Sequence, residues 1–148
     1  AYGPGMKLQH DGRVMADFLG KVLQNEDILI KSDGTAERSF VYVRDAVLGI
    51  LSIVLKHTTD NFVFNLSNET EPLTITDLAY LIKNCGQQFG LKSQVILSKN
   101  HIIGKGYSKN KRVPLNTTNL ERLGWRPSLS LEAGILNTLS VYNEIKGK

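Results

Sequence analysis

The chain has 148 residues, a length typical of one domain or most of one. Hydrophobic residues make up 41% and charged residues 22%, which excludes wholesale disorder, a collagen-like repeat and a coiled coil. The formal charge of +4 is compatible with a nucleic acid and equally with a small anionic ligand. The longest apolar run, residues 46–55, is much shorter than the roughly 20 residues of a membrane span.

The spacing of apolar residues predicts a mixed α/β fold with about five helices and several short strands. In chain order, helices are expected at residues 11–25, 45–55, from 75 to a glycine at 86 or 90, at 118–124 and at 131–145. Strands are expected at residues 27–31, 39–43, 61–66 and 93–98, with a turn at 32–34 and a loop rich in Gly and Lys at 101–115.

Several acidic residues stand at expected helix starts. Thr74 with Asp77 matches the pattern of a capping box, in which two side chains satisfy the free N–H groups of a helix start. Thr118 with Glu121 shows the same pattern, and Asp45 is expected to cap the second helix. These carboxylates are therefore interpreted as structural.

The single cysteine excludes an internal disulfide and a cysteine-rich zinc site. Cys85 stands among apolar helical positions and is predicted to be a buried thiol, and the lack of disulfides fits a reducing cytoplasm. The three histidines lack the spacing of a helical zinc pair, so no metal site is predicted. No G-x-G-x-x-G follows an expected strand, and residues 104–106 lack the length of a phosphate-binding P-loop.

Basic residues suggest an anion-binding role. Arg38 stands beside an expected strand, and Arg112 ends the basic loop that also holds Lys105, Lys109 and Lys111. Arginine can hold a phosphate through two parallel hydrogen bonds, whereas lysine offers a point charge. Two arginines converging on a diphosphate would explain this pattern, and a solvated loop that maintains solubility would explain it equally.

Five segments, in this order, resemble those of one enzyme family. Residues 2–6 (YGPGM) and 11–14 (DGRV) come first, and residues 32–45 (SDGTAERSFVYVRD) resemble the family segment G-D-G-x-x-x-R-x-F-x-Y-V-x-D. The fourth is residues 64–68 (FNLSN) with 73–75 (LTI), and the fifth is residues 112–114 (RVP) with 123–127 (LGWRP) and 131–134 (LEAG). Together they resemble the C-terminal half of an extended short-chain dehydrogenase of the NAD-dependent epimerase/dehydratase family. The nearest types are UDP-glucuronate decarboxylase, dTDP-glucose 4,6-dehydratase and UDP-glucose 4-epimerase.

The resemblance implies an enzyme built from two portions. In the family, an N-terminal Rossmann portion carries the Gly-rich NAD loop, the catalytic Tyr-x-x-x-Lys pair and an active-site Ser or Thr, and this sequence holds none of these motifs. Residues 1–148 are therefore expected to be the sugar-nucleotide-binding portion, opening inside a turn, with no catalytic residue and no activity alone. The parent is expected to be a cytoplasmic homodimer of nucleotide-sugar or polysaccharide biosynthesis that uses NAD for hydride transfer.

Matched positions carry the expected roles. The resemblance implies that Arg38 contacts the nucleotide ribose and diphosphate and that Arg112 contacts the diphosphate. The residues expected around the base are Val14, Phe18, Ile30 and Lys31, and those expected near the nicotinamide and sugar are Tyr2, Gly3 and Pro4. Asp45 matches a structural aspartate, and Trp125 is expected to pack in the interior.

Departures from the family pattern leave the substrate open. Gly5 stands where the decarboxylases have Arg, Lys31 where Tyr is usual, and Leu115 where Asp is usual. The sugar, the base and the choice between epimerisation, dehydration and decarboxylation are therefore not predicted. The alternatives are a non-catalytic module that binds a sugar nucleotide or an anion, and a nucleic-acid-binding domain, although the basic loop lacks aromatic residues beyond Tyr107.

Overall fold

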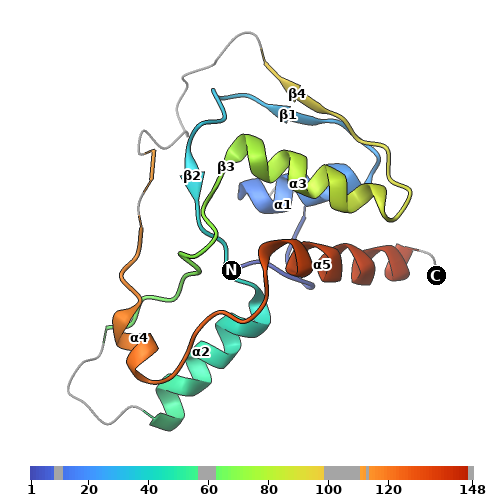
Figure 1. The fold of residues 1–148 in the computed structure, drawn as a ribbon. Coiled ribbons are helices and arrows are strands. Elements are labelled where there is room, and N and C mark those ends of the chain that lie inside the picture. The colour runs from blue at the N-terminus through green and yellow to red at the C-terminus, as the bar shows by residue number, and fades with distance from the viewer. Residues whose placement is uncertain (9–11, 57–62, 99–110, 113, 147–148) are drawn as a thin grey trace.

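A computed structural model describes residues 1–8, 12–56, 63–98, 111–112 and 114–146. Within these residues the helices are α1 (Val14–Leu23), α2 (Val43–Lys56), α3 (Ile75–Gln87), α4 (Thr118–Arg122) and α5 (Leu131–Lys146). The strands are β1 (Ile28–Ile30), β2 (Glu37–Arg38), β3 (Leu73–Thr74) and β4 (Val95–Leu97). The predicted mixture of five helices with short strands is confirmed for this part of the chain (Figure 1).

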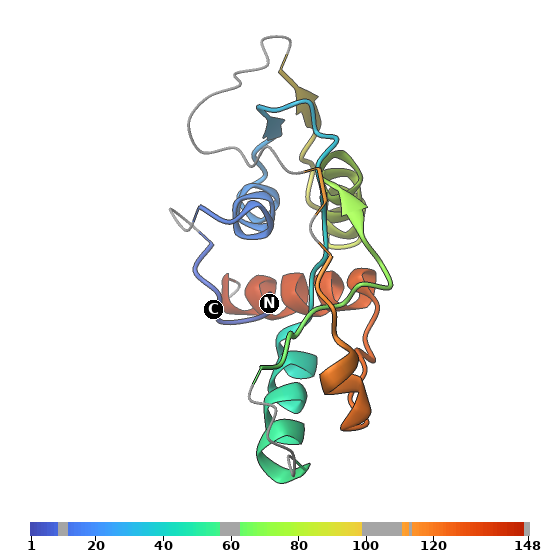
Figure 2. The ribbon, with the colours of Figure 1, turned by 90° about the vertical axis from the view of Figure 1, so that its left-hand side faces the viewer.

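The main core lies between α1, α3, α5 and strand β1. Apolar residues at helical spacing face it, as the sequence pattern predicts: Phe18, Leu19 and Val22 from α1, Leu78 and Ile82 from α3, and Ile135 and Leu139 from α5. Helices α1 and α3 lie next to each other and α5 runs beneath both (Figures 1 and 2). Cys85 is 1% exposed in this core, which confirms the predicted buried thiol.

Two separate two-stranded sheets frame the core. Strand β1 pairs with β4 in parallel, with Ile28 opposite Val95, and β2 pairs with β3 in antiparallel, with Arg38 opposite Leu73. Parallel pairing of β1 with β4 brings the ends of both strands to one side of the molecule. The second sheet is only two residue pairs long, so its geometry depends on the turns and helices around it.

Helix α3 begins as the sequence predicts. The Thr74 hydroxyl oxygen accepts a hydrogen bond from the backbone N–H of Asp77 at 3.0 Å, and the same hydroxyl donates to the Asp77 carboxylate at 2.6 Å. This N-cap stabilises the helix by about 1 kcal/mol. It also fixes the point where β3 ends and α3 starts, directly beside β2.

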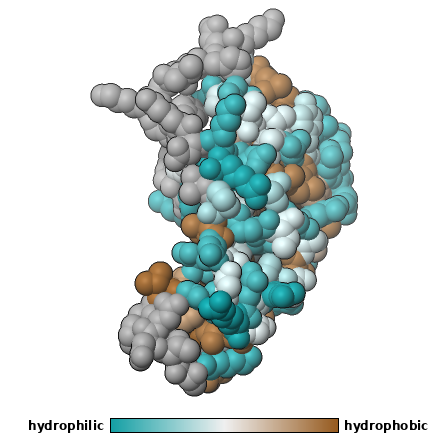
Figure 3. All heavy atoms as spheres, turned by 60° about the vertical axis from the view of Figure 1, so that its left-hand side comes forward, coloured by the Kyte–Doolittle hydropathy of each residue, from teal (hydrophilic) through white to brown (hydrophobic). Residues whose placement is uncertain are grey.

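Helix α2 extends away from the main core and forms a smaller cluster with α4 (Figure 1). Val41, Ala46, Leu120 and Trp125 form its buried part, which confirms the predicted packing role of Trp125. The opposite face of α2 exposes large apolar side chains: Val47, Leu48, Ile50, Leu51, Val54 and Leu55. Brown, apolar surface is visible at this lower end of the molecule in Figure 3.

Two predicted strands differ from the structure. Residues 39–43 were expected to be extended, but β2 ends at Arg38 and α2 already begins at Val43, leaving only a single bridge between Tyr42 and Tyr2. Within the predicted strand 61–66, the described residues 63–66 form no strand. The alternating apolar pattern is present in 61–66, but a strand also needs a hydrogen-bonding neighbour, and none pairs with it in the described part of the chain.

Further boundaries are adjusted by one to three residues. Helix α1 starts at Val14 and not at residue 11. The capping box expected of Thr118 and Glu121 is wrong, because Thr118 is already the first residue of α4 and the residue before it is Thr117, whose hydroxyl donates to Glu121 at 2.5 Å. The expected loop 101–115 lies largely outside the described residues. No helix within the described ranges is long and apolar enough to cross a membrane.

Candidate functional site

A tight turn at residues 32–35 connects β1 to β2. The Gly34 N–H donates to the Ser32 hydroxyl at 3.2 Å, and the Thr35 N–H donates to the Asp33 carboxylate at 3.1 Å, which is the local bonding expected of Ser and Asp in turns. Gly34 has φ +71°, and Thr76 donates to its carbonyl through both the backbone N–H and the hydroxyl, at 3.1 and 3.2 Å. The start of α3 therefore holds this turn in place.

Strand β2 is flanked by two segments that are distant in sequence. On one side it pairs with β3. On the other, the Glu37 N–H donates to the carbonyl oxygen of Lys111 at 2.6 Å. This bond brings the residue after Lys111, Arg112, next to the strand that carries Arg38, although Arg38 and Lys111 are 73 residues apart in the chain.

Arg38 is held by backbone oxygens. Its Nη1 atom donates to the carbonyl of Glu37 at 2.6 Å and lies 3.5 Å from the carbonyl oxygen of Lys111. The guanidinium is therefore fixed at the junction of β2 with residues 111–112. A guanidinium presents its N–H donors in a planar fork, a geometry that suits the binding of an oxyanion.

Arg112 is held by carboxylates. Its Nε atom lies 3.7 Å from the Glu37 carboxylate, and its Nη2 atom lies 3.9 Å from Oε2 of Glu69. The other oxygen of Glu69 accepts a hydrogen bond from the Ser67 hydroxyl at 2.6 Å. Both arginines that the sequence singles out therefore contact strand β2 or its neighbour Lys111, Arg38 through backbone oxygens and Arg112 through the Glu37 carboxylate.

The residues expected around the base are divided between the core and the surface. Phe18 and Ile30 are buried in the main core, and Val14 packs partly against it. Lys31 is exposed at the end of β1, directly before the turn that leads to Arg38. Lys31 therefore precedes Arg38 along the chain, while the side chains of Phe18 and Ile30 pack in the core.

The first residues of the chain are tied into the fold. Tyr2 is buried, its hydroxyl donates to the carbonyl of Leu131 at 3.0 Å, and its ring meets that of Tyr42 edge-on at 5.6 Å. Burial, with the neighbouring Tyr42, raises the pKa of Tyr2 far above its ordinary value. Gly3 fits tightly, because a Cβ atom there would lie 2.4 Å from Val43. Pro4 is partly buried.

The place of residues 2–4 near the nicotinamide and sugar stays a prediction. The ring and the hydroxyl of Tyr2 are both engaged inside the protein, and the space at Gly3 is filled by Val43. We therefore derive no step through NAD from these residues. Burial also raises the pKa of the Cys85 thiol to about 11, so this cysteine is not a nucleophile at neutral pH.

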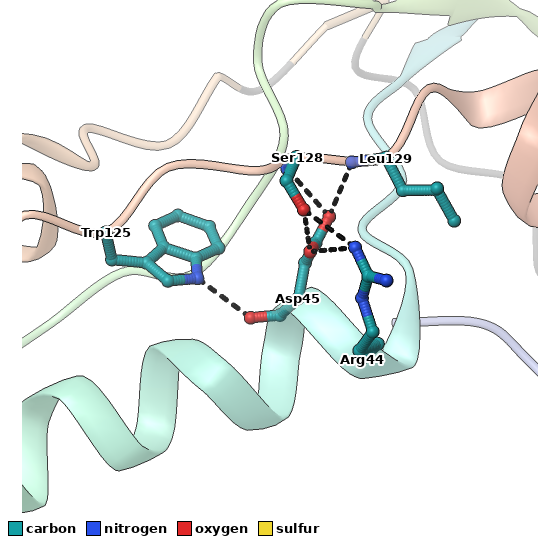
Figure 4. Close-up of polar contacts among 5 residues, drawn as sticks. All are labelled: Arg44, Asp45, Trp125, Ser128 and Leu129. Atoms are coloured by element: carbon teal, nitrogen blue, oxygen red, sulfur yellow. Dashed lines mark hydrogen bonds and ion pairs between the residues drawn. The ribbon is translucent and has the colours of Figure 1, made fainter.

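Asp45 joins α2 to the segment before α5 (Figure 4). Its carboxylate accepts hydrogen bonds from the N–H groups of Ser128 and Leu129 at 2.9 and 3.0 Å and from the Ser128 hydroxyl at 2.8 Å. The indole N–H of Trp125 donates to the Asp45 backbone carbonyl at 2.8 Å. Burial alone would raise the pKa of Asp45, but these hydrogen bonds and Arg44 outweigh it, so the pKa is lowered.

This arrangement corrects one expectation. Asp45 is the third residue of α2 and not the residue before it, and its carboxylate bonds to residues 128 and 129 and not to its own helix start. The local sequence around Asp45 does not predict its hydrogen bonds to Ser128, which is 83 residues away. The family segment, which marked Asp45 as structural, is the one signal that pointed to such a role.

Comparison with known proteins shows which proteins the chain is similar to. Residues 1–67 match the sequence model of the NAD dependent epimerase/dehydratase family. UDP-glucuronic acid decarboxylase 1 of Arabidopsis thaliana is 31% identical over 152 residues, which cover 99% of this chain and 32% of that protein. UDP-D-apiose/UDP-D-xylose synthase 1 of the same plant is 30% identical over 146 residues, which cover 93% of this chain and 38% of that protein.

A solved structure extends the match to the fold. UDP-glucose 4-epimerase of Thermotoga maritima, crystallised with UDP-glucose, superposes with a TM-score of 0.80 at 28% identity, over 98% of this chain and 44% of that one. The resemblance to NAD-dependent epimerases and dehydratases and the predicted fold, that of part of an extended short-chain dehydrogenase, are therefore confirmed. NAD is the cofactor in the family's own description. The chain spans less than half the length of these relatives.

Proposed function

We propose that this chain is the substrate-binding portion of an NAD-dependent epimerase or dehydratase that acts on a nucleotide-diphosphate sugar. The observation that carries the proposal is the meeting of Arg38 and Arg112 at β2, where the Glu37 N–H bonds to the Lys111 carbonyl. In this proposal the two guanidinium groups bind the diphosphate, each through charge-assisted hydrogen bonds. Lys31, at the end of β1, is then placed to contact the nucleotide.

The proposal includes a second portion that binds NAD. The chain corresponds to 32–44% of the length of the relatives named above, so more than half of each relative has no counterpart in residues 1–148. The apolar face of α2 supports this arrangement, because seven large apolar side chains of this one helix, Val43 included, are exposed. Such faces are typical of surfaces that contact another protein surface. We assign it to the NAD-binding portion, in an enzyme that is a homodimer.

The chemistry then divides between the two portions. When bound, NAD accepts and returns the hydride of a sugar hydroxyl-bearing carbon. The residues of this chain bind the diphosphate. The sugar, which is attached to the diphosphate, is thereby held in a fixed position relative to NAD. Binding energy from a part of the substrate that does not react is one way in which enzymes orient the reacting atoms. The chain alone is expected to show no turnover with NAD and a UDP-, GDP- or dTDP-sugar.

Nucleotide-sugar or polysaccharide biosynthesis in the cytoplasm is the setting that this function suggests. A second candidate, a non-catalytic module that binds a sugar nucleotide, uses the same two arginines without any chemistry. It is favoured by one observation, namely that both arginines and their partners come from this chain alone.

Isothermal titration calorimetry with UDP tests the binding function. We expect the wild-type chain to bind UDP, and we expect Arg38→Ala and Arg112→Ala each to weaken binding at least tenfold, because each removes charge-assisted hydrogen bonds. Arg126→Ala, an arginine on the segment that follows α4, is the matched control and should bind as the wild type does. Equal affinity of all four proteins would contradict the proposed role of the two arginines. Turnover of a sugar nucleotide by the chain would contradict the division into two portions.

A further inference from the structure

The two carboxylates beside Arg112 differ in how firmly they are held. Glu69 is 20% exposed, and its Oε1 atom accepts a hydrogen bond from the Ser67 hydroxyl, so its side chain is fixed. Its Oε2 atom is buried and has no hydrogen-bond partner, so Arg112 at 3.9 Å is the cation that compensates it. Glu37 is 40% exposed, and its carboxylate contacts Arg112 alone among the interactions of the described residues.

These differences give the two pairs different strengths. A partly buried carboxylate that loses its counter-ion keeps the cost of its desolvation, so the Glu69 pair resists separation. An ion pair between exposed side chains contributes little, because water and salt screen it. At 3.7 Å for Glu37 and 3.9 Å for Glu69, neither carboxylate is within hydrogen-bond distance of Arg112, so the pairs differ in the exposure of the acid, 40% against 20%. Glu37 can therefore leave Arg112 at small cost, whereas Glu69 cannot.

Glu37 also lies beside a group that a bound anion would contact. Its carboxylate lies 3.7 Å from the Nε of Arg112, and its backbone carbonyl accepts a hydrogen bond from Arg38. A diphosphate that binds Arg112 must therefore approach the Glu37 carboxylate. Two like charges about 4 Å apart repel by about one RT or more even in water, which lowers the affinity for the anion.

We propose that Glu37 sets the affinity of this site for diphosphates by competing with them for Arg112, and that Glu69 is the positioning residue that holds Arg112 in place. The proposal rests on the function proposed above. A diphosphate displaces the Glu37 carboxylate from Arg112 and leaves the Glu69 pair intact. Neutralising the two acids should therefore have opposite effects on binding.

Calorimetry with UDP, UMP and uridine on Glu37→Gln and Glu69→Gln tests this opposition. Glu37→Gln should bind UDP about three- to tenfold more tightly than the wild type, bind UMP with a smaller gain and bind uridine without change, because only the phosphates are repelled. The gain should shrink in 0.5 M salt, which screens the exposed charge. Glu69→Gln should bind UDP more weakly, since Arg112 is no longer held.

The outcomes separate the two proposals. If the wild type binds UDP and Glu37→Gln binds it equally or more weakly, the competition is wrong while the proposed function stands. If both substitutions tighten binding alike, Glu69 has no positioning role and acts only through its charge. If the wild type, Glu37→Gln and Glu69→Gln all fail to bind UDP, the proposed function is contradicted and the competition with it. Circular dichroism melting of each variant confirms that the fold is retained.

Discussion

The Asp45 carboxylate accepts hydrogen bonds from both the backbone N–H and the hydroxyl of Ser128, a residue 83 positions further along the chain. This contact links the start of α2 to the segment that leads into α5, and so connects the small cluster around Trp125 to the main core. The side chain of Asp45 is only 1% exposed, so its negative charge is stabilised by the protein and not by water. We therefore expect Asp45 to be a main determinant of stability.

Asp45→Asn should destabilise the chain by about 2–3 kcal/mol, because the new amide replaces an acceptor that two N–H groups and one hydroxyl require. Ser128→Ala removes only the hydroxyl and should cost about 1 kcal/mol. Urea unfolding followed by the fluorescence of the single tryptophan, which is buried beside Asp45, measures both values. Equal effects of the two substitutions would contradict the central place of the carboxylate.

Acid should remove the contribution of Asp45. Because the pKa of Asp45 is lower in the folded than in the unfolded chain, its stabilisation is complete above the unfolded pKa, about 3.9, and is lost as the pH falls through the folded value. The difference in unfolding free energy between the wild type and Asp45→Asn should therefore shrink below pH 4. A difference that stays constant from pH 7 to pH 2.5 would show that the charge is not responsible.

Gly34→Ala should destabilise the turn that positions Arg38. Gly34 has a positive φ, and an added Cβ would lie 2.1 Å from the Thr76 hydroxyl oxygen. The Thr76 hydroxyl would then have to move and would lose its hydrogen bond to the Gly34 carbonyl. Gly90→Ala is the matched control, with a similar φ of +76° and no atom within 4 Å.

Both substitutions should lower the free energy of unfolding by about 1–2 kcal/mol, because alanine disfavours the left-handed backbone. Gly34→Ala should lower it by about 1 kcal/mol more, because the Thr76 hydrogen bond is lost. Only Gly34→Ala should also weaken UDP binding. Chemical unfolding and calorimetry measure the two effects. A Gly90→Ala variant that is as unstable and binds as weakly would argue against a special role of this turn.

The apolar face of α2 should make the isolated chain associate. Val54 and Leu55 are 73% and 78% exposed, so Val54→Gln with Leu55→Gln removes apolar surface without opening the core. We expect sedimentation of the wild type to depend on concentration, and the double variant to show weaker association with stability changed by no more than about 0.5 kcal/mol.

Ile145→Gln provides the comparison for this experiment, because Ile145 is 64% exposed but lies on α5. It should leave association unchanged. If the double variant and the wild type sediment alike at all concentrations, the face of α2 is not a contact surface.

Local patterns predicted the helices well, because each apolar stripe and each cap depends on residues within one or two turns, as Thr74 with Asp77 illustrates. Strands depend on a neighbour that the local pattern cannot identify, and residues 63–66 lack one in the described part of the chain. The meeting of Arg38 with Arg112 was one of two explanations of the basic residues, and the family resemblance also implied it. The carboxylates of Glu37 and Glu69 beside them were missed, since nothing in the sequence links positions 37, 69 and 112.

A titration of the ¹⁵N-labelled chain with UDP, followed by nuclear magnetic resonance, tests the central claim most directly. The account predicts that the largest shifts occur at the backbone amides of residues 34–38 and 111–112 and at the Nε–H signals of Arg38 and Arg112. Signals from the far end of α5 should stay in place. The absence of any shift at residues 34–38 and 111–112 at saturating UDP, or shifts confined to other parts of the chain, would contradict the assignment of these arginines to a diphosphate.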